Sequence, residues 1–252
     1  MIVIKYGGHA LPQPGEKSDV LQLIASRANT VGDVVLVHGG GPQIDAELRI
    51  HGIEREMRNG YRVTTSETFE VVQQVLSGQV LRTIVNALIA YGANPIGLSS
   101  ADGQLIRAVK MSDEIGLVGD IKRVDARVIE TLITNKYLPV ISPVGVDASG
   151  QGLNLNADLV AGAIAGAMSA DEVIFMTDVP GIYENWPDES SLMSEIDRES
   201  LRGMTFSEGM IPKVKAVLSA LDAGAKSARV IDGRSAINLE AALLGDGGTV
   251  IS

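Results

Sequence analysis

The chain has 252 residues, of which 45% are hydrophobic and only 4% are aromatic, and its formal net charge is -10. A nucleic-acid-binding protein would be expected to carry a basic stripe, and none is visible in the sequence, so any anionic substrate must be held by a few local cations. The sequence contains no cysteine, which excludes disulfides, thiolate metal sites and cysteine nucleophiles.

The N-terminus leads directly into an apolar strand pattern, and the sequence has neither a signal peptide nor a segment long enough to span a membrane. We therefore expect a cytoplasmic protein with no nucleic-acid partner and no membrane contact.

Short apolar runs alternate with segments of helical periodicity along the chain. In chain order, the pattern predicts strands at 2–4 and 34–37, a hairpin at 54–64, a long helix at 66–91, a strand pair at 105–110 and 120–124, a helix at 125–135, a strand at 138–141, a helix at 157–168, a strand at 173–176, a helix at 212–223 and a strand at 229–231. This alternation indicates an α/β protein with a mostly parallel sheet.

The hairpin at 54–64 is predicted from its Asn59-Gly60 turn. Residues 185–207 form the most polar and irregular stretch, which we interpret as a mobile surface loop. Strand-helix units precede and follow residue 170, so the pattern favours two lobes, at 1–170 and 171–252.

Two glycine-rich clusters follow the first two predicted strands. Lys5-Tyr6-Gly7-Gly8-His9 places a lysine and two glycines where parallel sheets bind ligands, although an ordinary tight turn would have the same pattern. His38-Gly39-Gly40-Gly41-Pro42 has three glycines without Cβ atoms, which lets backbone amides approach an anion. The second cluster matches neither a Walker A loop nor a dinucleotide fingerprint, and its alternative role is a sharp strand-to-helix connection.

Two further polar clusters open predicted helices. In Asn154-Leu155-Asn156-Ala157-Asp158, Asn156 is a natural N-cap and Asp158 lies in the first turn, so a well-capped helix is as good an interpretation as a polar site. In Gly209-Met210-Ile211-Pro212-Lys213, the lysine lies near the positive end of the helix. That position is unfavourable for a cation unless an anion binds nearby.

Taken together and in this order, the clusters resemble the amino acid kinase family, and within it the acetylglutamate kinases. The resemblance covers nearly the whole chain and includes two further segments, Gly60-Tyr61-Arg62-Val63-Thr64 and Thr177-Asp178-Val179-Pro180-Gly181. It implies a three-layer α/β/α sandwich around a mostly parallel sheet. The implied activity is ATP-dependent phosphorylation of the side-chain carboxylate of N-acetyl-L-glutamate, in arginine biosynthesis, with the acceptor bound by residues 1–170 and ATP by residues 171–252.

The resemblance also implies roles for single residues. Lys5 and Lys213 would stabilise the transferring phosphoryl group, and Asp158 would hold both lysines in place. The expected acceptor-binding residues are Gly40, Gly41, Arg62, Asn154 and Asn156. The expected nucleotide-binding residues are Gly7, Gly8, Thr177, Asp178, Gly181, Gly209 and Met210.

The chemistry of a carboxylate acceptor agrees with this set of residues. The acceptor is already ionised at pH 7, so the reaction needs alignment of two anions and neutralisation of their charge rather than a general base. Mg²⁺ is expected to be held mainly by ATP phosphates and water, with no dedicated set of protein ligands.

Two departures from the family pattern carry expectations of their own. His9 stands where many acetylglutamate kinases have Asn, which alters that turn. The chain also starts directly at the first strand, whereas the arginine-inhibited members that it resembles carry an extra N-terminal helix that links dimers into hexamers. We therefore expect an arginine-insensitive homodimer with the 66–91 helix at its interface.

Two rival functions remain open at this stage. A sister kinase would phosphorylate aminoadipate or glutamate attached to an acidic carrier protein, which Arg55, Arg58 and Arg62 would contact. A non-catalytic regulatory module with the same fold would be indicated by loss of a lysine or of Asp158, and all three are present. The spacing of the glycines disfavours a dinucleotide-dependent oxidoreductase.

Overall fold

The computed structural model describes residues 1–12, 15–206 and 210–252. Its centre is an eight-stranded sheet in the order β12-β14-β13-β11-β1-β2-β8-β5, in which every neighbouring pair is parallel except β13 and β14. The strands of this sheet are β1 (Ile2–Tyr6), β2 (Val34–His38), β5 (Pro95–Ser99), β8 (Leu138–Ser142), β11 (Glu172–Thr177), β12 (Glu195–Ile196), β13 (Ala228–Asp232) and β14 (Thr249–Ile251).

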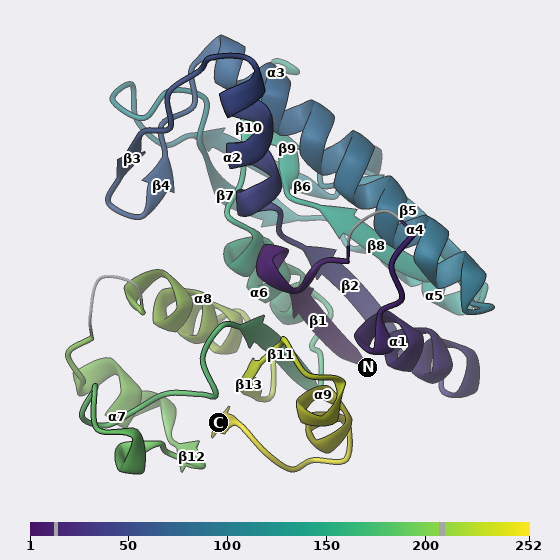
Figure 1. Cartoon of the computed structure of the whole chain (residues 1–252), viewed down its shortest axis with the longest axis vertical. Coiled ribbons are helices and arrows are strands. Elements are labelled where there is room, and N and C mark those ends of the chain that lie inside the picture. Colours follow the sequence, from purple (N-terminus) through teal and green to yellow (C-terminus); the bar gives the residue numbers. More distant parts are fainter. Residues whose placement is uncertain (13–14, 207–209) are drawn as a thin grey trace.

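Helices cover both faces of the central sheet (Figure 1). One face carries α1 (Asp19–Thr30), α3 (Ser66–Gln73), the π-helical segment η2 (Gln74–Val80), α4 (Leu81–Ala90) and α9 (Ala236–Leu243). The other carries α5 (Arg127–Thr134), α6 (Ala157–Ala167), α7 (Arg198–Gly203) and α8 (Ile211–Asp222). The predicted three-layer α/β/α architecture is confirmed.

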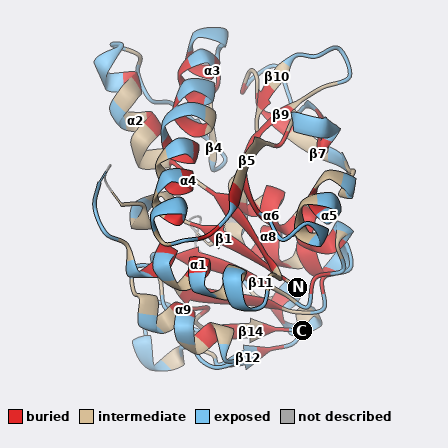
Figure 2. Ribbon diagram, turned by 90° about the vertical axis from the view of Figure 1, so that its right-hand side faces the viewer, coloured by how far each residue is buried: buried red, intermediate tan, exposed pale blue. Residues whose placement is uncertain are grey.

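The alternation of side chains along β1 divides the core into two parts. Ile2, Ile4 and Tyr6 pack with the α1 and α4 layer, whereas Val3 packs with the α6 and α8 layer. Lys5 shares the Val3 face because side chains alternate along a strand. The buried residues in Figure 2 follow the sheet and the inner faces of the helices.

Smaller elements extend the half of the molecule that contains α2 (Gly41–Ile50), next to α3 and η2. A second sheet has the order β10-β9-β6-β7, from β6 (Ile106–Lys110), β7 (Gly119–Val124), β9 (Val144–Val146) and β10 (Gly152–Asn154). A hairpin pairs β3 (Met57–Arg58) with β4 (Tyr61–Arg62). Both predicted hairpins are confirmed, and the one around Asn59-Gly60 is shorter than predicted.

The described part of the predicted loop, residues 185–206, is more regular than the sequence predicts. It includes a short helical turn η4 (Glu189–Ser191), the edge strand β12 and the helix α7. Asp197 caps α7 by accepting a hydrogen bond from Ser200 N at 2.9 Å. A two-residue strand and a six-residue helix are too short to give a periodic signal.

Candidate functional site

The glycines after β1 and β2 lie against one another at the carboxyl ends of these adjacent strands. A Cβ atom on Gly8 would lie 2.9 Å from Gly40 N, and one on Gly7 would lie 2.9 Å from Met176 O. Larger residues would therefore collide with backbone at both positions. Gln43 fixes this contact from α2, because its Nε2 donates to Gly8 O at 3.0 Å.

The second glycine loop leads into α2, with Gly40 as the N-cap and Gly41 as the first helical residue. Within the described part of the chain, the amides of Gly8, Gly40 and Gly41 donate to no protein acceptor. Free amides at a helix N-terminus are a ready binding site for phosphate or carboxylate.

Lys5 faces α6, where its Nζ lies 2.9 Å from Asp158 Oδ1, and both side chains are nearly buried. Asp158 is held at the start of α6 because Asn156 Oδ1 accepts hydrogen bonds from the amides of Asp158 and Leu159, at 2.9 and 3.1 Å. This Asn156 cap was predicted. A paired, nearly buried lysine at the end of β1 places a fixed positive charge beside the glycine amides.

Lys213 lies in the first turn of α8, across the same cavity from the glycine loops. Among the described residues, Asp158 forms its ion pair with Lys5, and none joins it to Lys213. Lys213 therefore presents a positive charge to the cavity without an acidic partner among the described residues. Its position is unfavourable for a cation, because the helix dipole is positive at the N-terminus.

The cavity is also lined by Arg62 at the end of β4 and by Asn154 at the end of β10. Arg62 Nη2 lies 2.5 Å from Asp45 Oδ1 on α2, while Arg62 Nη1 is buried and has no hydrogen-bond partner in the described chain. Asn154 Nδ2 donates to Thr64 Oγ1 at 3.1 Å, which fixes the amide plane. A buried, unpartnered guanidinium N–H is costly unless a ligand accepts its hydrogen bond.

The two glycine loops, Lys5, Lys213, Arg62 and Asn154 line one cavity of about 310 Å³. Of the predicted site residues, those that line it are Lys5, Gly7, Gly8, Gly40, Gly41, Arg62, Asn154, Asn156, Asp158, Thr177, Asp178 and Lys213. His9 borders it as an exposed residue of the short helical turn η1 (Gly8–Ala10).

A second cavity of about 570 Å³ adjoins the first, because Asp178 and Lys213 line both. Met210 lines the second cavity, together with Tyr183, Trp186 and Phe206. The Tyr183 and Trp186 rings meet edge to face with centroids 5.1 Å apart. An aromatic and apolar pocket next to a cationic one suits a planar base attached to phosphates.

The two remaining predicted nucleotide-binding residues are both glycines. Gly181 lines neither cavity, and a Cβ atom there would lie 2.4 Å from Thr249 Oγ1, so close packing explains the glycine. Gly209 lies outside the described residues.

Sequence reasoning missed several residues of the site. Arg234 lines the first cavity and follows β13, in an ion pair with Asp232 at 2.6 Å. Its place just beyond a predicted strand was a usable signal, because ligands bind at the carboxyl ends of parallel strands. Trp186, the only tryptophan of the chain, was a signal for the aromatic pocket. Nothing in the sequence pattern marked Asp45 as the partner of Arg62.

No group of three or more His, Cys, Asp or Glu side chains among the described residues is arranged to hold a metal ion. Likewise, none of the helices that the structure describes is both long and apolar enough to cross a membrane.

The fold and the site together define a class of protein. It is an α/β protein with one cavity, lined by two lysines and by glycines with free amides, that is suited to binding anions. The Amino acid kinase family model matches residues 1–232. The chain belongs to the amino acid kinase family.

Individual relatives are more specific. The chain is 43% identical over 253 residues to the chloroplastic acetylglutamate kinase of Arabidopsis thaliana, covering 98% of this chain and 73% of that protein. It is 41% identical over 243 residues to the acetylglutamate kinase of Mycolicibacterium vanbaalenii, covering 93% of this chain and 84% of that one. The structure of smu.665 from Streptococcus mutans UA159 matches with a TM-score of 0.84 at 29% identity, covering 100% of this chain and 98% of that one.

Proposed function

We propose that the protein transfers the γ-phosphoryl group of ATP to the side-chain carboxylate of N-acetyl-L-glutamate, in arginine biosynthesis. The observation that carries the substrate assignment is the identity of 41–43% with acetylglutamate kinases over more than nine-tenths of the chain. The site supports the reaction, because two lysines and the glycine amides converge on one cavity that Arg62 and Asn154 also line.

In the proposed reaction, a carboxylate oxygen of the acceptor forms a bond to the γ-phosphorus while the bond to the β,γ-bridging oxygen breaks, and ADP leaves. The carboxylate is ionised at neutral pH, so no group of the protein has to remove a proton. Lys5 and Lys213 balance the charge on the transferring group from two sides, and Asp158 holds Lys5 in place through the 2.9 Å ion pair.

The glycine loops bind the phosphoryl oxygens in this proposal. Gly7 and Gly8 allow the ATP phosphates to approach the end of β1, and the amides of Gly40 and Gly41 donate to the reacting groups. Alignment of two bound anions supplies a large part of the rate enhancement for such a transfer.

Arg62 and Asn154 are assigned to the acceptor. The unpartnered Nη1 of Arg62 would donate to a carboxylate, and Asn154, oriented by Thr64, would pair with the acetyl amide. Asn156 supports this end as the cap of α6, since its Oδ1 is already engaged by two backbone amides.

The nucleotide is assigned to the second half of the chain, residues 171–252. Thr177, Asp178 and Met210 line the cavities on this side, and the pocket of Tyr183, Trp186 and Phe206 would take the base. Residues 1–170 would then bind the acceptor. Mg²⁺ would be held mainly by ATP phosphates and water and would offset their charge, and Asp178 lines the cavity on this side.

We further propose a homodimer in which the helical segment 66–90 forms part of the interface. Its outer face is exposed, and it includes the half-exposed apolar residue Ile89. A single species of twice the chain mass in light scattering is expected, and a monomer at assay concentrations would refute this part.

The structure weakens the rival proposal of a carrier-bound acceptor. Each of the three arginines that would contact an acidic carrier already has an acidic partner: Arg55 and Arg62 pair with Asp45, and Arg58 pairs with Glu56. Asp45 and Glu56 therefore offset two of the three positive charges of this cluster.

The free-acceptor proposal is tested by ADP release in a coupled assay that contains only Mg-ATP and free N-acetyl-L-glutamate. We expect saturable turnover without any carrier protein. Turnover that appears only after a carrier-bound acceptor is added would transfer the assignment to the rival reaction.

A further inference from the structure

His38 is the last residue of β2 and is completely buried. Its Nδ1 lies 2.8 Å from Gly39 O. A carbonyl oxygen only accepts hydrogen bonds, so Nδ1 must carry a proton and donate it. Burial lowers the pKa of His38 to about 4, so the ring is neutral at pH 7 and this is its single N–H proton.

The other ring nitrogen, Nε2, makes His38 energetically unfavourable at this position. His38 Nε2 is buried and has no hydrogen-bond partner in the described part of the chain. The four preceding residues of β2 are all aliphatic and buried. An apolar residue would avoid the unpaired ring nitrogen but would give up the hydrogen bond to Gly39 O, so that hydrogen bond, rather than packing alone, explains a histidine here.

The hydrogen bond from His38 controls the peptide that joins Gly39 to Gly40. Gly39 N donates to Tyr6 O at 2.8 Å, which anchors the preceding end. In a planar trans peptide, the N–H of Gly40 points opposite to the carbonyl of Gly39, and therefore away from the imidazole. Gly40 N faces Gly8, on the side of the site cavity, and has no acceptor among the described residues.

We propose that His38 is a positioning residue for the phosphoryl transfer: by holding the Gly39 carbonyl, its Nδ1–H aims the Gly40 amide at the charge that develops on the reacting oxygens. His38 itself does not touch a substrate. The inference rests on the proposed function, because it assigns a purpose to an amide of that site. Fixed donors of this kind act mainly on the transition state when they are aimed at the oxygens on which charge develops.

Two polar substitutions separate this role from packing. In His38→Asn the amide nitrogen is attached to Cγ, as Nδ1 is, so it can still donate to Gly39 O, whereas His38→Gln places its nitrogen one bond further out. We expect His38→Asn to keep kcat within about threefold and His38→Gln to lose about 10- to 100-fold in kcat, with both KM values within about threefold. Equal kcat in the two variants would overturn the proposal.

The variant His38→Leu tests whether a loss of kcat reflects loss of the donor or merely unfolding of the protein. It removes the unpaired Nε2 and suits the apolar surroundings, but it also removes the donor to Gly39 O, so we expect a Tm close to that of the wild type together with the same loss of kcat as His38→Gln. A Leu variant that is fully active would contradict the positioning role, whatever its Tm.

The orientation of the amide can be measured without knowing the acceptor. Glycine follows glycine only at Gly8, Gly40, Gly41 and Gly248, so labelling glycine with ¹³C at the carbonyl and with ¹⁵N selects these amides in a carbonyl-correlated NMR spectrum. We expect Mg-AMP-PNP to shift the Gly40 signal in the wild type and in His38→Asn, but not in His38→Gln. The same shift in His38→Gln would refute the inference. Wild-type protein that fails to phosphorylate N-acetylglutamate would instead refute the proposed function and leave this comparison intact.

Discussion

Lys213 and Lys215 are two residues apart on α8, but only Lys213 faces the site cavity. Lys213 lies near the positive end of a helix, which is unfavourable for a cation, and it has no acidic partner among the described residues. Lys215 is exposed. Comparing substitutions of the two lysines therefore distinguishes an effect of charge at the site from an effect of charge elsewhere on α8.

We predict that Lys213→Met lowers kcat at least about a hundredfold with an unchanged Tm, because it removes a charge that stabilises the transferring group. Lys215→Met is the matched control and should stay within about twofold. Steady-state kinetics and thermal unfolding measure both. Similar kcat values for the two variants would remove Lys213 from the mechanism.

Lys5 differs from Lys213 because its removal leaves the nearly buried Asp158 without its ion pair. We predict that Lys5→Met loses activity to a similar degree and also about 1–3 kcal/mol in the free energy of unfolding. Urea unfolding followed by circular dichroism measures the second effect. An unfolding free energy equal to that of Lys213→Met would show that the Lys5–Asp158 pair contributes nothing to stability.

Arg62 and Arg58 lie on the two strands of the same hairpin. We predict that Arg62→Ala raises KM for N-acetylglutamate at least about tenfold and leaves KM for ATP within about twofold, because it removes a buried donor to the acceptor carboxylate. The matched control, Arg58→Ala, removes an exposed arginine paired with Glu56 and should change neither value. An effect of Arg62→Ala on ATP alone would overturn its assignment.

At the residue scale, the sequence predicts those residues whose role follows from their position at the end of a helix or strand. Asn156 was predictable as a cap because its type and its position before an apolar helix suffice. The partners of a side chain were not predictable, since Asp45 meets Arg62 across 17 positions of sequence. His38 was noted as part of a glycine-rich cluster, but its hydrogen bond depends on a backbone geometry that the pattern does not contain.

The long helix at 66–91 illustrates the same limit at the scale of elements. Its apolar stripe predicts its position well, but its middle turns, η2, are π-helical. Leu76 in this segment packs over Gly40, where a Cβ atom would lie 2.6 Å from its Cδ2, and Ser77 bonds to Ser142 at 2.9 Å. π-Helical segments recur at functional sites because they re-aim side chains, and tertiary contacts of this kind leave no periodic signature.

The start of this helix depends on Thr65, whose Oγ1 accepts from Thr68 N at 3.1 Å. We predict that Thr65→Ala lowers the free energy of unfolding by about 1 kcal/mol, because the Thr68 amide loses its partner. Thr30→Ala, at the exposed end of α1, is the control and should change it by less than about 0.5 kcal/mol. Urea titrations compare them, and equal effects would show that the cap is not what stabilises the start of α3.

Some elements were missed because their sequences are poor examples of their type. β5 begins with Pro95 and contains Gly97, both disfavoured in strands, and it pairs only with β8 in the described sheet. β14 has three residues and follows two glycines of positive φ, Gly247 and Gly248. Sheet pairing, rather than local preference, determines such strands.

At the scale of the whole molecule, the site exists because β13, β11, β1 and β2 are neighbours in the sheet. Their carboxyl ends bring Arg234, Thr177 and the two glycine loops to one edge, although these residues are far apart in sequence. The α/β class and the edge that binds ligand follow from the strand-helix pattern, but the order of the strands does not.

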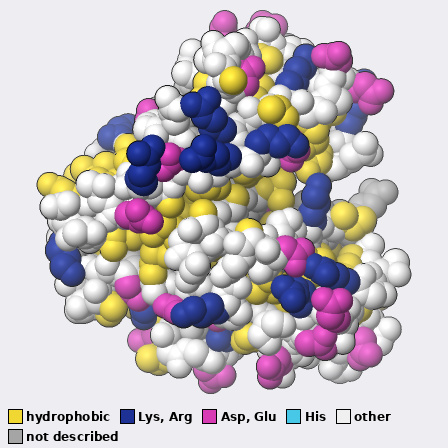
Figure 3. All heavy atoms as spheres, turned by 180° about the vertical axis from the view of Figure 1, so that it is seen from behind, with side chains coloured by type: hydrophobic (Ala, Val, Ile, Leu, Met, Phe, Trp, Pro, Cys, Tyr) yellow, Lys and Arg dark blue, Asp and Glu magenta, His cyan; other side chains and the backbone are white. Residues whose placement is uncertain are grey.

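Surface charge is consistent with a site served by local cations. On the face drawn in Figure 3, several Lys and Arg side chains gather across the upper part, whereas acidic side chains are more frequent in the lower part. The net charge of -10 is compatible with an anionic substrate because Lys5, Arg62, Lys213 and Arg234 line the site cavity.

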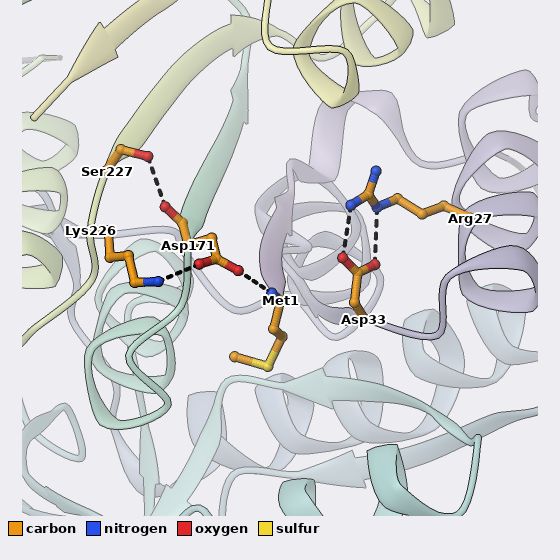
Figure 4. Close-up of polar contacts among 6 residues, drawn as sticks. All are labelled: Met1, Arg27, Asp33, Asp171, Lys226 and Ser227. Carbon is orange, nitrogen blue, oxygen red and sulfur yellow. Dashed lines mark hydrogen bonds and ion pairs between the residues drawn. The ribbon is translucent and has the colours of Figure 1, made fainter.

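Asp171 joins the two halves of the chain at the edge opposite the site (Figure 4). Its carboxylate pairs with the Met1 amino group and with Lys226 Nζ, the latter at 2.6 Å, and its carbonyl accepts from Ser227 Oγ at 2.9 Å. The hydrogen bond from Lys226 is the main reason that the pKa of Asp171 falls to about 2, with the Met1 amino group next.

This pKa gives a stability prediction with a definite sign. The native pKa lies below the value of about 3.9 for an unfolded chain, so the carboxylate stabilises the fold above that pH and loses its contribution as the pH falls toward about 2. We predict that Asp171→Asn is less stable than the wild type at pH 6 and that the difference shrinks steadily below pH about 4. Chemical unfolding at a series of pH values measures it, and a difference independent of pH would contradict the ion-pair account.

The central claim is that this site makes an acyl phosphate on the side chain of N-acetylglutamate. The most direct measurement traps that product as a hydroxamate, with Mg-ATP and a panel of N-acetylglutamate, glutamate, aspartate, N-acetylaspartate and 2-aminoadipate. We predict strong hydroxamate formation with N-acetylglutamate alone, and its loss in Lys213→Met but not in Lys215→Met. Product with another member of the panel in preference to N-acetylglutamate, or none with any of them, would contradict the account.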